Sequence, residues 1–113
     1  MADDLAVLKG TLDLLVLKAL TRRPMHGFEI TRWLEARSGQ RLTLEDAALY
    51  QALYRMEKRG LLEAEWGVTD LNRRARYYRL TARGEAELED RTTWWLRYAE
   101  TLTDILMDEL ETA

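Results

Sequence analysis

Residues 43–80, TLEDAALYQALYRMEKRGLLEAEWGVTDLNRRARYYRL, decide the fold because the spacing of their apolar side chains changes at Gly60. Before Gly60 the apolar residues recur at helical spacing, and they are Leu49, Ala52, Leu53 and Met56. Thr43 is a suitable N-cap, with Asp46 three positions later as the acidic member of a capping box. Gly60 is a suitable residue to follow the last helical turn. This half of the stretch therefore predicts a helix that begins after Thr43 and ends at Gly60.

After Gly60 the period becomes two. Apolar side chains alternate with glutamates over 62–66, which is typical of a half-buried strand. A second alternating run covers 76–80, and the intervening 67–75 is predicted to be a loop that carries Arg73 and Arg74. Thr81 then caps a further helix that is expected to continue to residue 113. The second half of the stretch thus predicts a two-stranded β-hairpin followed by a long helix.

Two more helices are expected before this stretch. Residues 5–21 carry leucines and valine at helical spacing, and Pro24 separates them from a helix over 27–38 that ends at Gly39. The predicted order is helix, helix, helix, strand, strand, helix. The fold class is mainly α: a winged helix-turn-helix of three helices plus a two-stranded β-hairpin wing, with a long C-terminal dimerisation helix. We divide the chain into a DNA-binding domain at 1–81 and the dimerisation helix at 82–113.

In a winged helix-turn-helix the third helix enters the major groove, while the hairpin loop reaches the DNA backbone or the minor groove. The face of the third helix opposite its core carries hydrogen-bonding side chains with reach, namely Tyr50, Gln51, Tyr54, Arg55 and Lys58. The hairpin adds Arg73, Arg74 and Arg76 within four positions. Gln51 can pair with adenine and Arg55 with guanine, so these two are candidate base readers. The alternative is a solvated amphipathic helix beside a surface hairpin.

The formal net charge of −3 hides an uneven distribution. Residues 22–83 carry 13 Lys/Arg against 8 Asp/Glu, whereas residues 84–113 carry 2 against 9. The middle of the chain therefore suits a polyanion, and the acidic tail suits solvent or a protein partner. A charged surface that is merely solvated remains the alternative.

The predicted fourth helix has apolar residues at heptad positions, with Leu88, Trp95 and Leu102 at one position and Tyr98 and Ile105 at the other. A helix of about 30 residues extends roughly 45 Å, more than so small a domain covers, so part of its stripe is expected to pair with a second copy. The alternative is a helix that folds back on its own domain. Trp94 and Trp95 either fill the core or wall a cavity for a flat, small aromatic effector between the subunits.

Other classes of protein fit poorly. There is no cysteine, no signal peptide and no apolar run of about 18 residues, so we expect a cytoplasmic protein with no membrane partner. One histidine and no cysteine do not make a transition-metal site without several carboxylates, and we expect no cofactor. The sequence contains neither a glycine-rich phosphate loop nor a nucleophile motif, so we do not expect an enzyme. His26 itself is either a phosphate contact or pH sensor, or a capping and packing group at the start of the second helix.

The sequence resembles the PadR family of bacterial transcriptional regulators over roughly residues 8–88. The resemblance is carried by KGTLDLLVL (9–17), MHGFEI (25–30), LYQALYRMEKRGLL (49–62) and RYYRLT (76–81). It implies a homodimeric repressor that is controlled by a small molecule and binds double-stranded DNA, for which two-fold symmetry predicts an inverted-repeat operator. The chain departs from the family pattern at Gln51, where proline is usual, at Phe28, where tyrosine is usual, and at Ala75, which interrupts the basic run. A winged-helix protein–protein interaction module is the alternative, which the positive third helix and hairpin disfavour.

Overall fold

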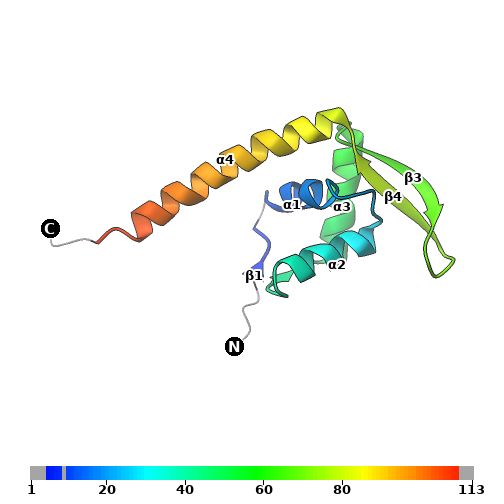
Figure 1. Cartoon of the computed structure of the whole chain (residues 1–113), viewed down its shortest axis with the longest axis horizontal. Coiled ribbons are helices and arrows are strands. Elements are labelled where there is room, and N and C mark those ends of the chain that lie inside the picture. Colours follow the sequence, from blue (N-terminus) through cyan, green and yellow to red (C-terminus); the bar gives the residue numbers. More distant parts are fainter. Residues whose placement is uncertain (1–4, 9, 110–113) are drawn as a thin grey trace.

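The helices α1 (Leu12–Ala19), α2 (Gly27–Arg37) and α3 (Asp46–Lys58) surround one apolar core in the computed structural model, which describes residues 5–8 and 10–109. The strands β3 (Leu62–Val68) and β4 (Arg74–Leu80) follow as an antiparallel hairpin. Figure 1 shows the hairpin projecting from one end of the helical part. The predicted fold class is confirmed: a mainly α winged helix-turn-helix whose wing is β3–β4.

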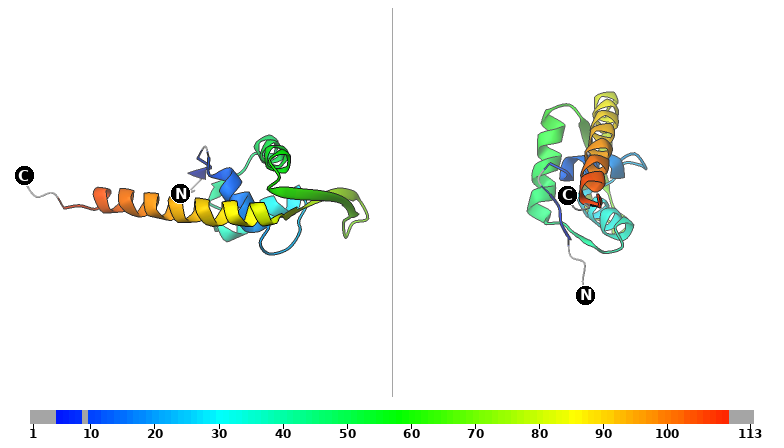
Figure 2. Two further views of the ribbon diagram at one scale, coloured as in Figure 1. Left: turned by 90° about the horizontal axis from the view of Figure 1, so that it is seen from above. Right: turned by 90° about the vertical axis from the view of Figure 1, so that its left-hand side faces the viewer.

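Two further features complete the chain. The long helix α4 (Ala82–Leu106) leaves the helical part on the side away from the hairpin (Figures 1 and 2). A short parallel pair joins β1 (Leu5–Ala6) to β2 (Leu42–Thr43). No helix among residues 5–8 and 10–109 is both long enough and apolar enough to cross a membrane.

The core lies where the predicted apolar stripes meet. Ile30 and Leu34 of α2 are buried, as are all four apolar residues predicted for α3, and Trp33 packs against them partly exposed. The segment before α2 is fastened to the wing, because Met25 and Tyr78 exchange backbone hydrogen bonds of 3.1 and 2.8 Å. The fully buried side chains include Leu17, Met25, Ile30, Leu49, Leu53, Met56, Leu61, Leu62 and Val16. The base of the wing and the three helices therefore form one packed unit.

The prediction of a helix over 5–21 is wrong at its N-terminal end. Residues 5 and 6 form β1, and the helix begins only at Leu12. Gly10 has φ +91°, a left-handed conformation that interrupts a helix and that glycine adopts without steric cost. Leu5 instead donates its backbone N–H to the carbonyl of Arg41 at 2.7 Å. Pairing with a distant segment therefore replaces local helix formation here.

Two boundaries of the predicted helix-and-hairpin stretch also differ. Thr43 is not the N-cap of α3, because it pairs with Ala6 in β2, and Glu45 takes the cap position without a side-chain cap hydrogen bond. The strands extend to Val68 and from Arg74, so the predicted loop at 67–75 shortens to 69–73. Gly60, with φ +79°, follows the C-cap of α3 as predicted.

The start of α4 is fixed against the junction of α3 and β3. Thr81 is its N-cap as predicted: the hydroxyl accepts from the N–H of Gly84 at 3.0 Å and donates to the carbonyl of Gly60 at 2.7 Å. The backbone N–H of Thr81 donates to the carbonyl of Leu61 at 3.1 Å. The helix ends at Leu106, earlier than the predicted end at residue 113, and residues 110–113 lie outside the described part.

Candidate nucleic-acid interface

The solvent-facing side of α3 carries the five polar residues that the sequence singles out. They are all exposed, namely Tyr50, Gln51, Tyr54, Arg55 and Lys58. The opposite side of the helix is buried in the core, so its orientation is fixed by packing. This arrangement presents long donors and acceptors from a rigid helix, which is what reading a DNA groove needs.

The polar side chains on this face of α3 differ in their surroundings. The ammonium of Lys58 lies 5.3 Å from the centre of the Tyr54 ring. The guanidinium of Arg55 reaches back to α1, where its Nη2 lies 2.9 Å from Oδ1 of Asp13. Partial burial, and then the nearby charge of Asp46, raise the pKa of the Tyr50 phenol. Tyr50 is therefore a neutral hydrogen-bond donor at physiological pH.

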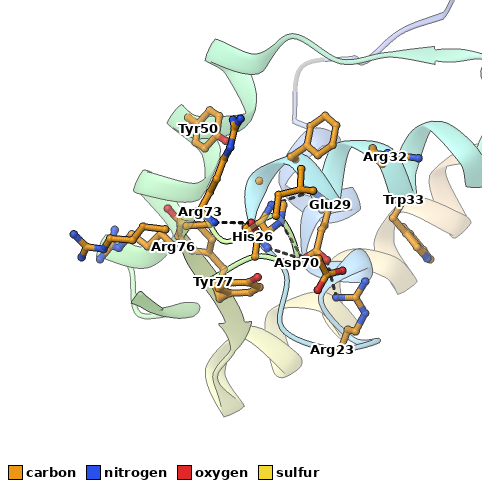
Figure 3. Close-up of a pocket in the computed structure, with 17 residues that line it drawn as sticks. Arg23, His26, Glu29, Arg32, Trp33, Tyr50, Asp70, Arg73, Arg76 and Tyr77 are labelled. Atoms are coloured by element: carbon orange, nitrogen blue, oxygen red, sulfur yellow. Dashed lines mark hydrogen bonds and ion pairs between the residues drawn. The ribbon is translucent and has the colours of Figure 1, made fainter. Parts of the chain in front are cut away.

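A cleft of about 1000 Å³ separates α2 from the wing, with Tyr50 at its α3 side. Figure 3 shows Arg32 of α2, Tyr50 of α3 and Arg73 of the wing loop around it. The lining residues with cationic side chains are Arg23, Arg32, Arg73, Arg74 and Arg76. The carboxylates of Glu29 and Asp70 also line it. The excess of arginine makes this cleft attractive to phosphate groups.

The three wing arginines have different surroundings. Arg74 lies over the Trp66 ring at 4.6 Å, and the backbone of Arg73 closes the loop by accepting from the N–H of Thr69 at 2.8 Å. Neither guanidinium forms an ion pair with any residue in the described part of the chain. Both are therefore available to an external anion.

Arg76 is placed otherwise. Its two Nη atoms donate to the two carboxylate oxygens of Glu57 at 2.9 and 2.8 Å, which joins β4 to the last turn of α3. The hydrogen bond to Glu57 is the largest cause that raises the pKa of the Arg76 guanidinium. This bidentate pair has defined geometry and links the wing to α3. The assignment of Arg76 to phosphate stays a prediction.

Sequence reasoning missed the contribution of α2 to this cleft. Phe28 is 62% exposed, and the guanidinium of Arg32 lies 5.5 Å from its ring centre. These residues are four positions apart, on the face opposite the buried Ile30 and Leu34. The i, i+4 spacing of an exposed aromatic and a cation was the available signal.

The lone histidine has a structural role. His26 is the N-cap of α2: its Nδ1 accepts from the N–H of Glu29 at 3.4 Å, and the Glu29 carboxylate accepts from the N–H of His26 at 3.2 Å. This reciprocal pair is a capping box. Of the two predicted roles, capping is confirmed.

The residues predicted on α4 fall into two groups. Leu88 packs against the core of its own chain, and Trp95 is half-buried in a groove of about 430 Å³ beside Leu14 of α1. Beyond them Tyr98, Leu102 and Ile105 are exposed by 48%, 39% and 67%. Trp94 is also exposed and stacks on Tyr98 with ring centres 5.0 Å apart. The first half of α4 thus lies against its own domain, and the second half offers an uncovered apolar stripe.

Comparison with known proteins agrees with this geometry. The sequence pattern of the transcriptional regulator PadR-like family matches residues 16–90. The chain belongs to the PadR-like family. An uncharacterized protein X of Lysinibacillus sphaericus is 29% identical over 105 residues, which are 93% of this chain and 95% of the relative. The predicted resemblance to this family is confirmed, and the matched region contains the motifs at 25–30, 49–62 and 76–81.

Solved structures of PadR-like regulators are also similar. A PadR-like transcriptional regulator from Bacillus cereus superposes with a TM-score of 0.77 at 25% identity, covering 90% of this chain and 97% of the other. A PadR family transcriptional regulator from Eggerthella lenta gives a TM-score of 0.75 at 29% identity, covering 89% and 86%. This PadR-like chain is therefore a DNA-binding transcriptional regulator with the winged-helix fold.

Proposed function

We propose that this PadR-like protein is a cytoplasmic, homodimeric repressor that reads an inverted-repeat operator and releases it when a small aromatic effector binds. The observation that carries the proposal is the exposure of polar side chains along α3, one of which, Tyr50, lines a cleft together with Arg73 and Arg74 of the wing, whose guanidiniums form no ion pair among the described residues. Base contacts specify a sequence, and phosphate contacts position the protein on it. Both kinds of contact are available, the first from α3 and the second from the wing.

Side-chain chemistry distinguishes the proposed base contacts from the proposed phosphate contacts. Gln51 and Arg55 lie one turn apart on α3 and carry the groups that pair bidentately with adenine and guanine. Arg73 and Arg74 extend from the wing, where a flexible cation meets phosphate of any sequence. Tyr50 and Tyr54 add phenolic donors for phosphate or apolar contact for thymine methyl groups.

Dimerisation is supported by the exposed stripe on α4. Beyond the groove the stripe includes Tyr98, Leu102, Ile105 and Leu106, all exposed in the single chain. A contiguous exposed apolar stripe on a helix marks an interaction surface. A second copy supplies the same stripe, and a two-fold axis between the helices would present two α3 helices to successive major grooves.

The effector is proposed to bind at Trp94 and Trp95. Both line the groove between α1 and α4. Asp90 lines it too, and Glu87 is paired there with Arg91, so a planar cation would meet two indole rings and the carboxylate of Asp90. The start of α4 is fixed to the end of α3 through Thr81. A ligand that prefers one placement of α4 therefore changes the spacing of the two α3 helices, and so changes DNA affinity.

The DNA-binding proposal is tested by measuring affinity for a selected operator and for unrelated DNA at several salt concentrations. Arg73→Ala and Arg74→Ala should weaken binding to both DNAs and reduce the magnitude of the salt slope by about 0.9 per lost phosphate contact. Gln51→Ala should instead lower the preference for the operator by about 1–3 kcal/mol. The matched control is Arg79→Ala, because Arg79 lies on the same hairpin but is paired with Glu63 and Glu65. Unchanged affinity and slope in both wing variants would contradict the proposal.

The effector site is tested by titrating planar cationic dyes and following tryptophan fluorescence. Quenching is expected in the wild type and should weaken in Trp94→Phe and Trp95→Phe. Quenching that survives both substitutions must come from Trp33 or Trp66, and would show that Trp94 and Trp95 are packing residues only.

A further inference from the structure

The ion pair between Asp13 and Arg55 connects α1 to the proposed reading face of α3. Oδ1 of Asp13 lies 2.9 Å from Nη2 of Arg55. The Asp13 side chain is only 14% exposed, whereas the Arg55 side chain is 55% exposed. Gln51, Arg55 and Asp13 line a shallow groove together, so the carboxylate stands beside both proposed base readers. One partner of the pair is held by the protein and the other faces solvent.

Asp13 is held in place by its helix. It lies in the first turn of α1, where a carboxylate interacts favourably with the helix dipole. The same short helix is anchored in the core by the buried Val16, Leu17 and Ala19. The position of the carboxylate is therefore set by the core, and it does not follow the movement of Arg55.

The contact also leaves part of the guanidinium free. Arginine has five N–H donors in a planar fork, and the only Arg55 side-chain bond in the described part of the chain uses one nitrogen. A guanidinium held through one nitrogen is restricted in position and keeps its remaining donors free, and these donors form the planar fork that bidentate pairing with guanine uses. The negative charge of Asp13 meanwhile offsets the positive charge of Arg55, which reduces its attraction to phosphate of any sequence.

We propose that Asp13 is a specificity-determining positioning residue, which directs Arg55 to a base edge and keeps it from acting as a general phosphate contact. The inference rests on the proposed DNA-reading function of α3. Asp13 itself is not proposed to contact DNA, because it acts through Arg55. Lys58, the other cation on this face, lies over the Tyr54 ring and has no such carboxylate among the described residues.

The test compares wild type and Asp13→Asn for binding to a selected operator and to unrelated DNA. Both affinities are measured on one preparation, so the ratio does not depend on the folded fraction. We expect the preference for the operator to fall about tenfold. We also expect the salt slope on unrelated DNA to steepen by up to about 0.9, because the freed Arg55 becomes a phosphate contact. The control is Glu63→Gln, which removes the same charge from the ion pair with Arg79 on the wing and should leave the ratio unchanged.

A second pair of proteins shows whether Asp13 acts through Arg55. In an Arg55→Ala background, Asp13→Asn should change neither the ratio nor the slope. A ratio that falls equally in that background, or one that stays at the wild-type value in Asp13→Asn alone, overturns the inference. A wild-type protein without any preference between DNAs would instead overturn the proposed function, so the two failures are distinguishable.

Discussion

At the scale of single residues, the contact between Gly27 and Tyr50 shows how α2 and α3 share the cleft. Gly27 is buried at the first position of α2. A Cβ atom at this residue would lie 2.5 Å from the Tyr50 hydroxyl oxygen and 2.7 Å from Cζ. The absence of a side chain therefore allows the Tyr50 ring to rest against the start of α2. The position of Tyr50, a proposed DNA contact, therefore depends on a glycine of the neighbouring helix.

Gly27→Ala is expected to displace the Tyr50 ring and to lower the free energy of unfolding by about 1–3 kcal/mol, as overpacking does. DNA affinity should fall with it. In a Tyr50→Ala background the same substitution should be neutral or slightly stabilising, because the clash is gone and alanine favours helix. Urea unfolding of the four proteins measures this. A cost that persists without the Tyr50 ring would mean that Gly27 is required for another reason.

The contacts of Glu87 are expected to make the free energy of unfolding depend on pH in the acid range. It accepts a hydrogen bond from Arg91 Nε at 2.7 Å, and this bond is the largest cause that lowers the pKa of its carboxyl. Arg59 at the end of α3 contributes as well, with Nη2 at 3.6 Å. A carboxyl whose pKa is lower in the folded state stabilises the protein above its unfolded pKa, and this stabilisation is lost as pH falls through the folded value.

We therefore expect Glu87→Gln to unfold with a smaller dependence on pH in the acid range than the wild type. Urea midpoints measured from pH 7 downward compare the two proteins, and Glu85→Gln in the same helix serves as a control for the loss of a carboxylate. Parallel curves for wild type and Glu87→Gln would show that the contacts with Arg91 and Arg59 do not favour the charged form.

At the scale of elements, Glu57 and Arg76 form a bidentate ion pair between α3 and the wing. The sequence places Arg76 in a basic cluster with Arg73 and Arg74, which favours a phosphate contact. The bidentate pair with Glu57 arises only when β4 packs beside the last turn of α3, so no local pattern reports it. The spacing of charges along a strand predicts which residues are exposed, but not which of them are paired.

The two roles of Arg76 have different consequences for Glu57→Gln. If Arg76 braces the wing, Glu57→Gln and Arg76→Ala should each weaken DNA binding several-fold, and the double variant should be no worse than Arg76→Ala. If Arg76 contacts phosphate directly, Glu57→Gln should leave affinity unchanged or raise it. We expect the first result, and anisotropy titrations of the three variants at one salt concentration decide between the two.

The start of α4 depends on a glycine that no periodicity identified. A Cβ atom at Gly84 would lie 2.1 Å from the carbonyl oxygen of Leu61, which is backbone and has little freedom to move. Gly84→Ala is expected to cost about 3 kcal/mol in spite of the better helix propensity of alanine. Ala86→Gly, two residues later and exposed, should cost only about 1 kcal/mol. Equal costs in thermal or urea unfolding would show that α4 does not rest on the Leu61 carbonyl.

The predicted elements differ in how well local patterns define them. The buried faces of α2 and α3, the caps at Thr81 and Gly60 and the hairpin all follow from short-range spacing, and the structure has them. The first helix was predicted too long because Leu5 and Ala6 continue an apolar run, while their pairing with Leu42 and Thr43 is a tertiary contact. Whether such a two-residue segment forms a strand depends on a partner that is distant in the sequence. Local residue spacing therefore does not predict it.

At the scale of the whole molecule, the extended shape follows from α4. The chain measures 63 × 35 × 21 Å along its principal axes, and the far half of α4 extends beyond the helical part (Figure 2). Sequence spacing predicted the apolar stripe, but placed Leu88 in the dimer seam, whereas Leu88 packs on its own core. The first part of the stripe therefore packs within the chain, and only the second part is exposed for the proposed dimer; one heptad pattern does not separate these two parts.

A dimer through the far half of α4 predicts about twice the chain mass of 13.3 kDa in light scattering. Ile105→Asp should give a monomer, because a carboxylate would be buried without a partner. Thr103→Asp, which adds the same charge off the apolar stripe, should remain a dimer. A wild-type monomer at tens of micromolar, or a dimer that survives Ile105→Asp, would contradict this interface.

If two copies of α3 read DNA together, the protein should select a two-fold symmetric site. Selection from a random DNA pool tests this most directly. The purified protein is incubated with the pool, bound DNA is amplified over several rounds, and the recovered sequences are aligned. A dimer that presents two α3 helices to successive major grooves should select an inverted repeat whose half-sites are about 10 bp apart, or a multiple of that. Recovery of no common sequence, or of a single unrepeated site, would contradict it.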